Sequence, residues 1–535
     1  MTKTPFWTSA RLVILFSIFV TAVGNTAMYE KLFAWQSESG SEFFYVVTLI
    51  PFQVLLLTWI VSFLTFHGAY KYVLSLLLLI TAVSSYFSDA YGVVIDRGML
   101  INAVETNTAE ARDLISWQLL LYVVGIFVIP TIWLFSLEVR KQTFLKRVGS
   151  HLTTGISALV IAILVVLSMS SFYASFFREQ KAIRAYSSPM ATLYAGYQIL
   201  RKDIFSPTPK KIKKIGLDAK VIEKDVDREL IVMVVGETAR ADHFSLNGYP
   251  RKTNPLLEKQ AVVSFTDVDS CGTSTAHSVP CMFSIKKRQE FSTSEAKHEE
   301  NALDVLNRAG VNVLWRDNNS SSKGVADRVE YQDFRSSKTN PICDPECRDV
   351  GMLSGLDKYI ADHPTGDILI VLHQMGSHGP TYYQRYPKEF AIFGEGCETN
   401  QLDQCSIDQI TSSYDSTILY TDYFLNETIE FLKQYDQTFE TSMLYVSDHG
   451  ESLGENGLYL HAMPYAIAPR SQTNVPVILW MGAQHADYDL QRVLRAKDSN
   501  FSHHNVFHTL LGLFEIESEI YQPRLDLVNL GIKKH

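Results

Sequence analysis

The chain has 535 residues, of which 47% are hydrophobic, and it carries a formal net charge of −9 at pH 7. This length exceeds one ordinary domain, and an acidic balance without a dominant basic face excludes nucleic acid as the expected partner. The composition is uneven, because long apolar runs are confined to residues 1–177. The remainder has the composition of a soluble α/β protein.

Five apolar segments lie in the first part, at residues 12–29, 43–66, 72–94, 117–137 and 153–177. Each approaches or exceeds the roughly 20 residues that a helix needs to cross a bilayer core. We therefore expect a transmembrane domain of five helices over residues 1–177. Basic residues flank the segments on alternate sides, which predicts a cytoplasmic N-terminus and export of everything after residue 177. Because these segments carry almost no ionisable residues, a transporter is disfavoured.

The exported loop between the third and fourth segments contains Asn102, Thr106 and Glu110. If this loop is helical, the three side chains line one face at i, i+4 and i+8. Spacing alone favours a solvated helix face. Residues 178–228 then combine tyrosines with a tract of lysines, which is typical of an interfacial helical connector on the bilayer.

Apolar strand-like runs alternate with helical patterns in residues 229–535. The runs lie at residues 230–235, 311–315, 368–372, 442–446 and 475–480, and the helical patterns at 302–309, 355–362, 410–435 and 506–514. This alternation predicts a largely parallel sheet with helices on both faces. The active site of such a sheet gathers at the carboxyl ends of its strands. Polar residues follow three of the runs, and we expect them to share a site: Glu237, His373, His378, Asp448 and His449.

All six cysteines lie in the second part as three close pairs. This arrangement predicts local disulfides in an oxidising compartment, pairing Cys271 with Cys281, Cys343 with Cys347 and Cys397 with Cys405. A zinc site at the middle pair is less favoured, because no second pair at finger spacing accompanies it. The first pair brackets Thr275. A disulfide across this loop would fix the orientation of the Thr275 hydroxyl. Together with oxygen and nitrogen ligands elsewhere in the chain, such a hydroxyl suggests a metal-assisted nucleophile. The alternative is a surface loop that the disulfide stabilises and that has no catalytic role.

Five motifs together resemble the lipid A phosphoethanolamine transferases, a family within the alkaline phosphatase superfamily that includes polymyxin-resistance transferases. They are Val235–Pro250, Cys271–Cys281, Trp315–Asn319, Gly376–Pro380 and Ser447–Glu455. The resemblance implies five transmembrane helices followed by an α/β domain of alkaline phosphatase/sulfatase type. It also implies the inner membrane of a Gram-negative bacterium, a catalytic domain in the periplasm, and a monomer.

The same resemblance implies roles for individual residues. Glu237, Thr275, Asp448 and His449 resemble the ligands of a catalytic zinc, with Thr275 also the nucleophile. His378 and His461 resemble a catalytic pair that contacts phosphate or a second zinc. Lys323 resembles a phosphate contact. Asn102, Thr106 and Glu110 match loop residues that face the ethanolamine of the donor, which reverses the interpretation from spacing alone.

The implied reaction transfers phosphoethanolamine from phosphatidylethanolamine to a lipid A phosphate through a zinc-bound phosphothreonine, which reduces negative surface charge and polymyxin binding. Two alternatives stay open at this point: a related membrane transferase for phosphoglycerol or core sugars, and a binding or sensor protein with a degenerate site. Two departures from the family pattern are present. His461 is followed by Ala462 and Met463, where family members commonly have Gly after the His, and Ser322 and Ala326 stand where some members have a further cysteine pair.

Overall fold

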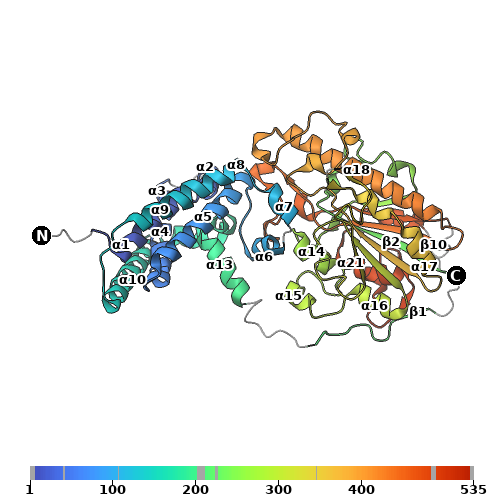
Figure 1. Cartoon of the computed structure of the whole chain (residues 1–535), viewed down its shortest axis with the longest axis horizontal. Coiled ribbons are helices and arrows are strands. Elements are labelled where there is room, and N and C mark those ends of the chain that lie inside the picture. Colours follow the sequence, from blue (N-terminus) through green and yellow to red (C-terminus); the bar gives the residue numbers. More distant parts are fainter. Residues whose placement is uncertain are drawn as a thin grey trace. The chain divides into compact units, whose positions relative to one another are not determined.

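The computed structural model describes residues 6–39, 43–105, 108–201, 211–222, 227–344, 346–483 and 490–529, without the side chains of residues 108–110 and 181 (Figure 1). The chain divides into two compact units, Met1–Leu100 with Ile115–Phe205, and Ile101–Leu114 with Ser206–His535. The loop between two apolar helices therefore belongs to the second unit. The boundaries at residues 177 and 228 that the sequence suggests stay a prediction.

The regular elements in the described part of the first unit are helices, apart from an isolated β-bridge between Trp7 and Val139. Its helices are α1 (Ser9–Val23), α2 (Thr26–Ser39), α3 (Phe43–Val47), α4 (Leu49–Thr65), α5 (Tyr70–Tyr91), α8 (Trp117–Tyr122), the π-helix η1 (Val123–Val128), α9 (Ile129–Ser136), α10 (Phe144–Ser168), α11 (Ser170–Glu179), α12 (Lys181–Ala185) and α13 (Met190–Ile199). Among the described residues, four runs are long and apolar enough to cross a membrane: Phe43–Thr65, Tyr70–Tyr91, Trp117–Ser136 and Phe144–Ser168. The bent pair of α1 and α2 makes a fifth if it is one span.

Two of the apolar segments differ in detail from their sequence-based ranges. The first is interrupted by a bend of 62° between α1 and α2. At this bend the Asn25 side chain donates hydrogen bonds to the carbonyl oxygens of Val20, at 3.2 Å, and Ser188, at 3.1 Å. The fifth segment corresponds to α10, which begins at Phe144 rather than residue 153 and ends at Ser168. Hydropathy marks only the apolar part of a helix, and α10 starts in a polar turn that contains Lys146 and Arg147.

The second unit is built on a seven-stranded sheet in the order β3-β13-β10-β2-β9-β5-β6. Its strands are β2 (Glu229–Gly236), β3 (Val263–Phe265), β5 (Asn312–Asp317), β6 (Glu330–Asp333), β9 (Ile368–His373), β10 (Glu440–Ser447) and β13 (Val477–Met481). Every neighbouring pair from β10 to β6 is parallel, and β13 runs antiparallel to both β10 and β3. The largely parallel sheet is thus confirmed. The edge strands β3 and β6 were not foreseen, because they are short and β6 is polar.

The central strands β2, β9 and β10 are buried along their whole length, which explains their continuous apolar runs. One core cluster joins one face of the sheet to residues of α14 (Thr275–Met282), α16 (Ala302–Ala309) and α21 (His504–Leu513). The long helix α18 (Ile407–Lys433) lies on the other side of the sheet (Figure 1). It begins with a capping box, in which Ser406 and Gln409 each bond the backbone N–H of the other.

Shorter elements complete the unit. They are the part of α6 (Arg97–Glu105) from Ile101 onward, α7 (Thr108–Asp113), α15 (Thr293–Ala296), α17 (Leu356–Asp362), α19 (Arg470–Thr473), α20 (Leu490–Ala496) and the paired strands β1 (Lys220–Val221) with β15 (Ile516–Glu517), β4 (Val268–Asp269) with β14 (Phe501–Ser502), β7 (Cys343–Asp344) with β8 (Glu346–Cys347), and β11 (Ser452–Leu453) with β12 (Tyr459–Leu460). The three expected disulfides are formed, with the predicted partners.

Candidate metal centre and active site

The first two carboxylates of the site lie at the ends of two neighbouring parallel strands. Glu237 follows β2 and Asp448 follows β10, and the two strands are paired along their full length, so both residues leave the same edge of the sheet. His449 completes the group, with its Nε2 3.5 Å from Oε1 of Glu237 and 3.3 Å from Oδ2 of Asp448. All three side chains are fully buried. The expectation that these strand ends share a site agrees with this geometry.

Thr275 reaches the same group from the first turn of α14. Its Oγ1 lies 3.3 and 3.2 Å from the two carboxylate oxygens of Glu237 and 3.4 Å from Nε2 of His449. The Cys271–Cys281 disulfide closes the loop on either side of it. The backbone N–H of Ala462 also donates to the carbonyl of Thr273, at 2.7 Å. The loop that carries this hydroxyl is therefore fixed covalently and by hydrogen bonds.

The donor atoms of this group fit a divalent metal ion. Nδ1 of His449 bonds the carbonyl of Gly450 at 2.9 Å, which assigns its proton to Nδ1 and leaves the Nε2 lone pair facing the group. Oδ1 of Asp448 accepts the backbone N–H groups of Thr238 and His449, whereas its Oδ2 is buried without a hydrogen bond. Two carboxylates, one imidazole and one hydroxyl form an oxygen and nitrogen set with the character of a catalytic metal site. The predicted ligands are thus assembled in one place.

The electrostatics of the two carboxylates differ. Burial alone would raise the pKa of Glu237, but the positive charges that His449, His378 and His461 carry when protonated outweigh it and lower the pKa to about 2. Burial, and next the charge of Glu237, raise the pKa of Asp448 to about 6. Two carboxylates this close repel each other, so a cation between them relieves the repulsion.

A second group of possible metal ligands lies beside the first and shares His449 with it. Glu451, His449 and His461 offer ligand atoms within 4.8 Å of one another. Nδ1 of His461 lies 2.9 Å from Oε2 of Glu451, whose Oε1 accepts the hydroxyl of Tyr382 at 2.7 Å. The ring of His378 lies 5.8 Å from that of His461. The predicted pair of histidines is therefore brought together at the edge of the site.

Strained backbone surrounds these residues. Four non-glycine residues adopt positive φ angles next to or at predicted site positions: Thr238 at 59°, Lys323 at 52°, Leu460 at 61° and Ala462 at 68°. Thr238 follows Glu237, and the last two flank His461. Such conformations cost of order 1–3 kcal/mol each and cluster at functional sites. Ala462, which stands where family members commonly have glycine, thus adopts a left-handed backbone conformation that favours glycine.

Three residues that support the site were not assigned roles from the sequence. Asn319 donates to Oε2 of Glu237 at 2.8 Å, and Glu451 holds His461. Both lie in motifs that the sequence singles out, so a signal was present. His503 is buried, and its Nδ1 accepts the backbone N–H of Cys271 at 3.1 Å. Its Nε2 lies 2.9 Å from the carbonyl of Ser447, so it joins the nucleophile loop to the end of β10.

The predicted substrate residues are only partly described. Nζ of Lys323 lies 3.4 Å from the backbone carbonyl of Glu105, at the end of α6. Asn102 lies on α6, partly buried. Thr106 and the side chain of Glu110 lie outside the described residues, so their placement toward a donor stays a prediction. The loop itself packs on the second unit, where Asp113 forms an ion pair with Arg385.

Comparison with known proteins extends over both units. A family model described as phosphoethanolamine transferase EptA/EptB matches residues 53–204, and a sulfatase model matches residues 229–516. Phosphatidylethanolamine transferase Mcr-1 of Escherichia coli is 40% identical over 529 residues, which cover 96% of each chain. Phosphoethanolamine transferase EptA of Escherichia coli K12 is 41% identical over 464 residues, which cover 85% of this chain and 84% of that protein.

A solved structure agrees with the sequence comparison. The integral membrane protein lipooligosaccharide phosphoethanolamine transferase A (EptA) from Neisseria meningitidis superposes with a TM-score of 0.93 and 32% identity, and it covers 98% of this chain and 99% of its own. The likeness therefore includes the apolar helices as well as the sheet that carries Glu237, Thr275, Asp448 and His449. The chain belongs to the phosphoethanolamine transferase family, with a catalytic domain of the sulfatase and alkaline phosphatase type.

Proposed function

We propose that this enzyme transfers phosphoethanolamine from phosphatidylethanolamine to a phosphate of lipid A through a covalent intermediate on Thr275. The observation that carries this proposal is the position of the Thr275 hydroxyl, 3.2–3.4 Å from Glu237 and His449. The relatives named above, at about 40% identity, support the donor and the transferred group. Addition of a cationic group to lipid A lowers its negative charge, which in turn weakens polymyxin binding.

The metal in this proposal is Zn²⁺, held by Glu237, Asp448, His449 and Thr275. When bound there, zinc would lower the pKa of the threonine hydroxyl and neutralise charge on the transferred phosphoryl group. Oxygen and imidazole ligands suit zinc, although other divalent ions share this preference. His461 and Glu451 offer ligands for a second ion.

Transfer then proceeds in two displacements. Thr275 releases its hydroxyl proton to solvent and its Oγ1 attacks the donor phosphorus. The bond to diacylglycerol breaks, and His378 or His461 supplies the proton that the leaving oxygen takes up. In the second half, an acceptor phosphate oxygen attacks the same phosphorus, and the bond to Thr275 breaks. Lys323 binds phosphate oxygens, and Asn102, Thr106 and Glu110 bind the ethanolamine group.

The proposed location is the inner membrane of a Gram-negative bacterium, with the catalytic domain in the periplasm. The basic-residue asymmetry of the apolar segments and the three disulfides support it. In this arrangement, residues 1–177 anchor the enzyme, residues 178–228 lie at the membrane surface and residues 229–535 carry the chemistry. Reporter fusions after Ser150 and Ser206 should give cytoplasmic and periplasmic signals respectively.

The acceptor is proposed to be lipid A rather than a sugar of the lipopolysaccharide core. Relatives whose name specifies Kdo(2)-lipid A phosphoethanolamine 7''-transferase are only 24% identical, compared with about 40% for Mcr-1 and EptA. Mass spectrometry of lipid A from a host expressing the gene distinguishes these acceptors.

The covalent step has a direct test on the purified full-length enzyme. Incubated with phosphatidylethanolamine and no acceptor, it should release diacylglycerol and gain phosphoethanolamine on the peptide that contains Thr275. Thr275→Ala should lose both products. The matched control is Ser274→Ala, which removes the neighbouring hydroxyl that caps no helix N–H, and it should retain both. Comparable transfer by Thr275→Ala would replace the covalent route by direct attack of the acceptor.

A further inference from the structure

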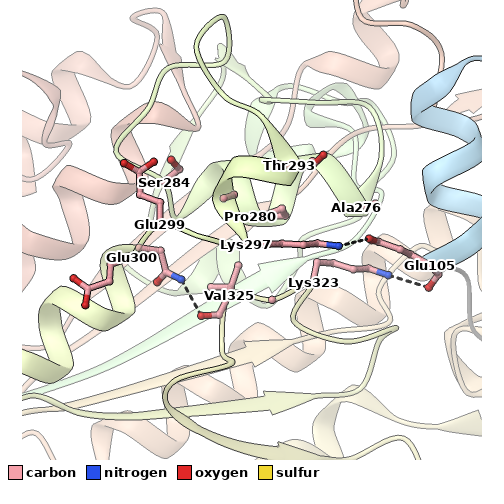
Figure 2. A pocket seen from close by; sticks show the side chains of 13 residues that line it. Glu105, Ala276, Pro280, Ser284, Thr293, Lys297, Glu299, Glu300, Lys323 and Val325 are labelled. Carbon is pink, nitrogen blue, oxygen red and sulfur yellow. Dashed lines mark hydrogen bonds and ion pairs between the residues drawn. The ribbon is translucent and has the colours of Figure 1, made fainter. Parts of the chain in front are cut away.

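A small pocket lies against α14, the helix that begins with the nucleophile (Figure 2). Ala276 and Pro280 of α14 line one side, and Lys297, Lys323 and Glu105 line another. Figure 2 shows the two lysine side chains extending in parallel toward Glu105, which comes from the end of α6. The pocket therefore joins the segment after Thr275 to the loop of residues 101–114, within one compact unit.

Glu105 lines this pocket and contacts both lysines. Nζ of Lys297 forms an ion pair with its Oε1 at 3.3 Å, and Nζ of Lys323 bonds its backbone carbonyl at 3.4 Å. The remaining space is about 20 Å³. That volume holds roughly one water molecule, so a phosphate group does not fit while the lining side chains, Glu105 among them, stay in place.

The other carboxylates of the pocket already have cationic partners. Glu299 pairs with Lys213 at 2.5 Å and with Lys286 at 2.9 Å, and Glu300 pairs with Arg308. Among the described residues, no carboxylate lies within ion-pair distance of Lys323. The pocket thus presents two ammonium groups whose charge is offset by one carboxylate, that of Glu105.

From this arrangement we infer that Lys297 and Lys323 form an anion subsite for the phosphomonoester of the acceptor, which Glu105 occupies until the acceptor displaces it. A phosphomonoester carries a charge of about −1.5 to −2 at neutral pH, whereas a phosphodiester such as the donor carries one negative charge. Two lysines beside a single carboxylate, with which only Lys297 forms an ion pair among the described residues, favour the more highly charged ligand. Lys297 is exposed over 58% of its side chain, so a ligand can reach it from solvent. The inference rests on the proposed function and assigns Lys297 and Glu105 roles in binding the acceptor phosphate.

The subsite is tested with full-length enzyme in detergent micelles, at saturating phosphatidylethanolamine and varied lipid A. Lys297→Gln should raise the KM for lipid A by about fivefold to tenfold, since it removes one partly exposed charge-assisted contact. Glu105→Gln should lower that KM by about twofold to threefold, because the competing anion loses its charge. Lys297→Arg should restore most of the affinity. The matched control is Lys287→Gln, which removes an exposed charge from a residue that does not line the pocket.

Each other outcome overturns the inference. An unchanged KM for lipid A in Lys297→Gln would show that this lysine binds no acceptor. An equal rise in the KM for phosphatidylethanolamine would assign it to the donor phosphodiester. A raised KM for lipid A in Glu105→Gln would mean that Glu105 supports binding rather than competes with it. Failure of the proposed function is separate from all of these, because the wild-type enzyme would then release no diacylglycerol even without acceptor.

Discussion

Arg385 and Asp113 form a salt bridge of 2.6 Å that ties the loop of residues 101–114 to the catalytic unit. The side chain of Arg385 is 2% exposed. Its Nε also donates to the backbone carbonyl of His378 at 2.7 Å, and its Nη1 pairs with Glu346. One guanidinium therefore links the loop proposed to bind the donor with a histidine proposed to serve the leaving group.

This link predicts a selective effect of Asp113→Asn. Loss of the carboxylate should loosen the loop and raise the KM for phosphatidylethanolamine severalfold, with a loss of stability of about 1–3 kcal/mol, because a charged partner of a buried guanidinium is removed. Steady-state kinetics and thermal unfolding measure the two effects.

Glu346→Gln is the matched control for this effect. It removes the other carboxylate from the same guanidinium without touching the loop. It should lower stability to a similar extent while leaving the KM for phosphatidylethanolamine near that of the wild type. Equal effects of both variants on this KM would show that the contact between Arg385 and the loop does not determine donor affinity.

Removal of the metal should destabilise the catalytic unit. Without a cation, Glu237 and Asp448 face each other as buried carboxylates, whereas a bound ion stabilises the folded state by about 4 kcal/mol at a thousandfold excess over its Kd. Thermal unfolding should shift to lower temperature after chelation and return when Zn²⁺ is added. Asp448→Asn should make the midpoint insensitive to chelator. A wild-type unfolding temperature that does not change on chelation would contradict the metal centre.

His503 is expected to position the nucleophile loop. Burial lowers its pKa to about 4, so the ring is neutral and can accept from Cys271 N–H while its other nitrogen donates to the Ser447 carbonyl. His503→Ala leaves both backbone groups without this partner. It should lower kcat by about tenfold or more with little change in KM, because a small displacement of Thr275 affects the reaction more than binding.

The control for His503 lies in α21, the helix that begins directly after it. His508 is also buried, and its Nδ1 accepts the backbone N–H of Gln522, away from the site. His508→Ala should reduce the unfolding temperature comparably and leave kcat near the wild-type value. If both variants lose activity in parallel with stability, His503 has no positioning role.

Asp422 should make stability depend on pH. Burial raises its pKa to about 7, although its carboxylate accepts the backbone N–H groups of Leu256 and Leu257. The folded state therefore binds a proton that the unfolded state releases between about pH 4 and pH 7. The stability that this proton provides is present at about pH 4 and is lost as the pH rises through 7.

Asp422→Asn tests this dependence, since the amide does not ionise. Relative to the variant, the wild type should lose up to about 4 kcal/mol between pH 4 and pH 7.5. Thermal unfolding of both proteins across this pH range measures the difference in their unfolding free energies. Groups that titrate in both proteins contribute equally and cancel in this difference. A difference that stays constant with pH would show that Asp422 titrates normally in the folded chain.

Much of the fold is encoded locally in the sequence. The buried strands β2, β9 and β10 appear as unbroken apolar runs because both of their faces are covered. Glu237 and Asp448 directly follow two of these runs. Because the carboxyl ends of parallel strands lie at one edge of a sheet, the sequence alone predicts that the two residues lie close together. The disulfides were likewise predictable, since each joins cysteines ten or fewer positions apart.

Only the tertiary structure determined which distant residues complete the site. His503 bonds Cys271 across 232 positions and Asn319 bonds Glu237 across 82, and no periodicity in either segment encodes such a contact. The edge strands β3 and β6 gain their hydrogen bonds from neighbours in the sheet rather than from propensity. The loop of residues 101–114 joins the catalytic unit through Asp113 and Glu105, because buried and paired charges select their partners in three dimensions. Local pattern thus determined the elements and the first ligands, and long-range packing determined how the nucleophile and the pocket beside it are held.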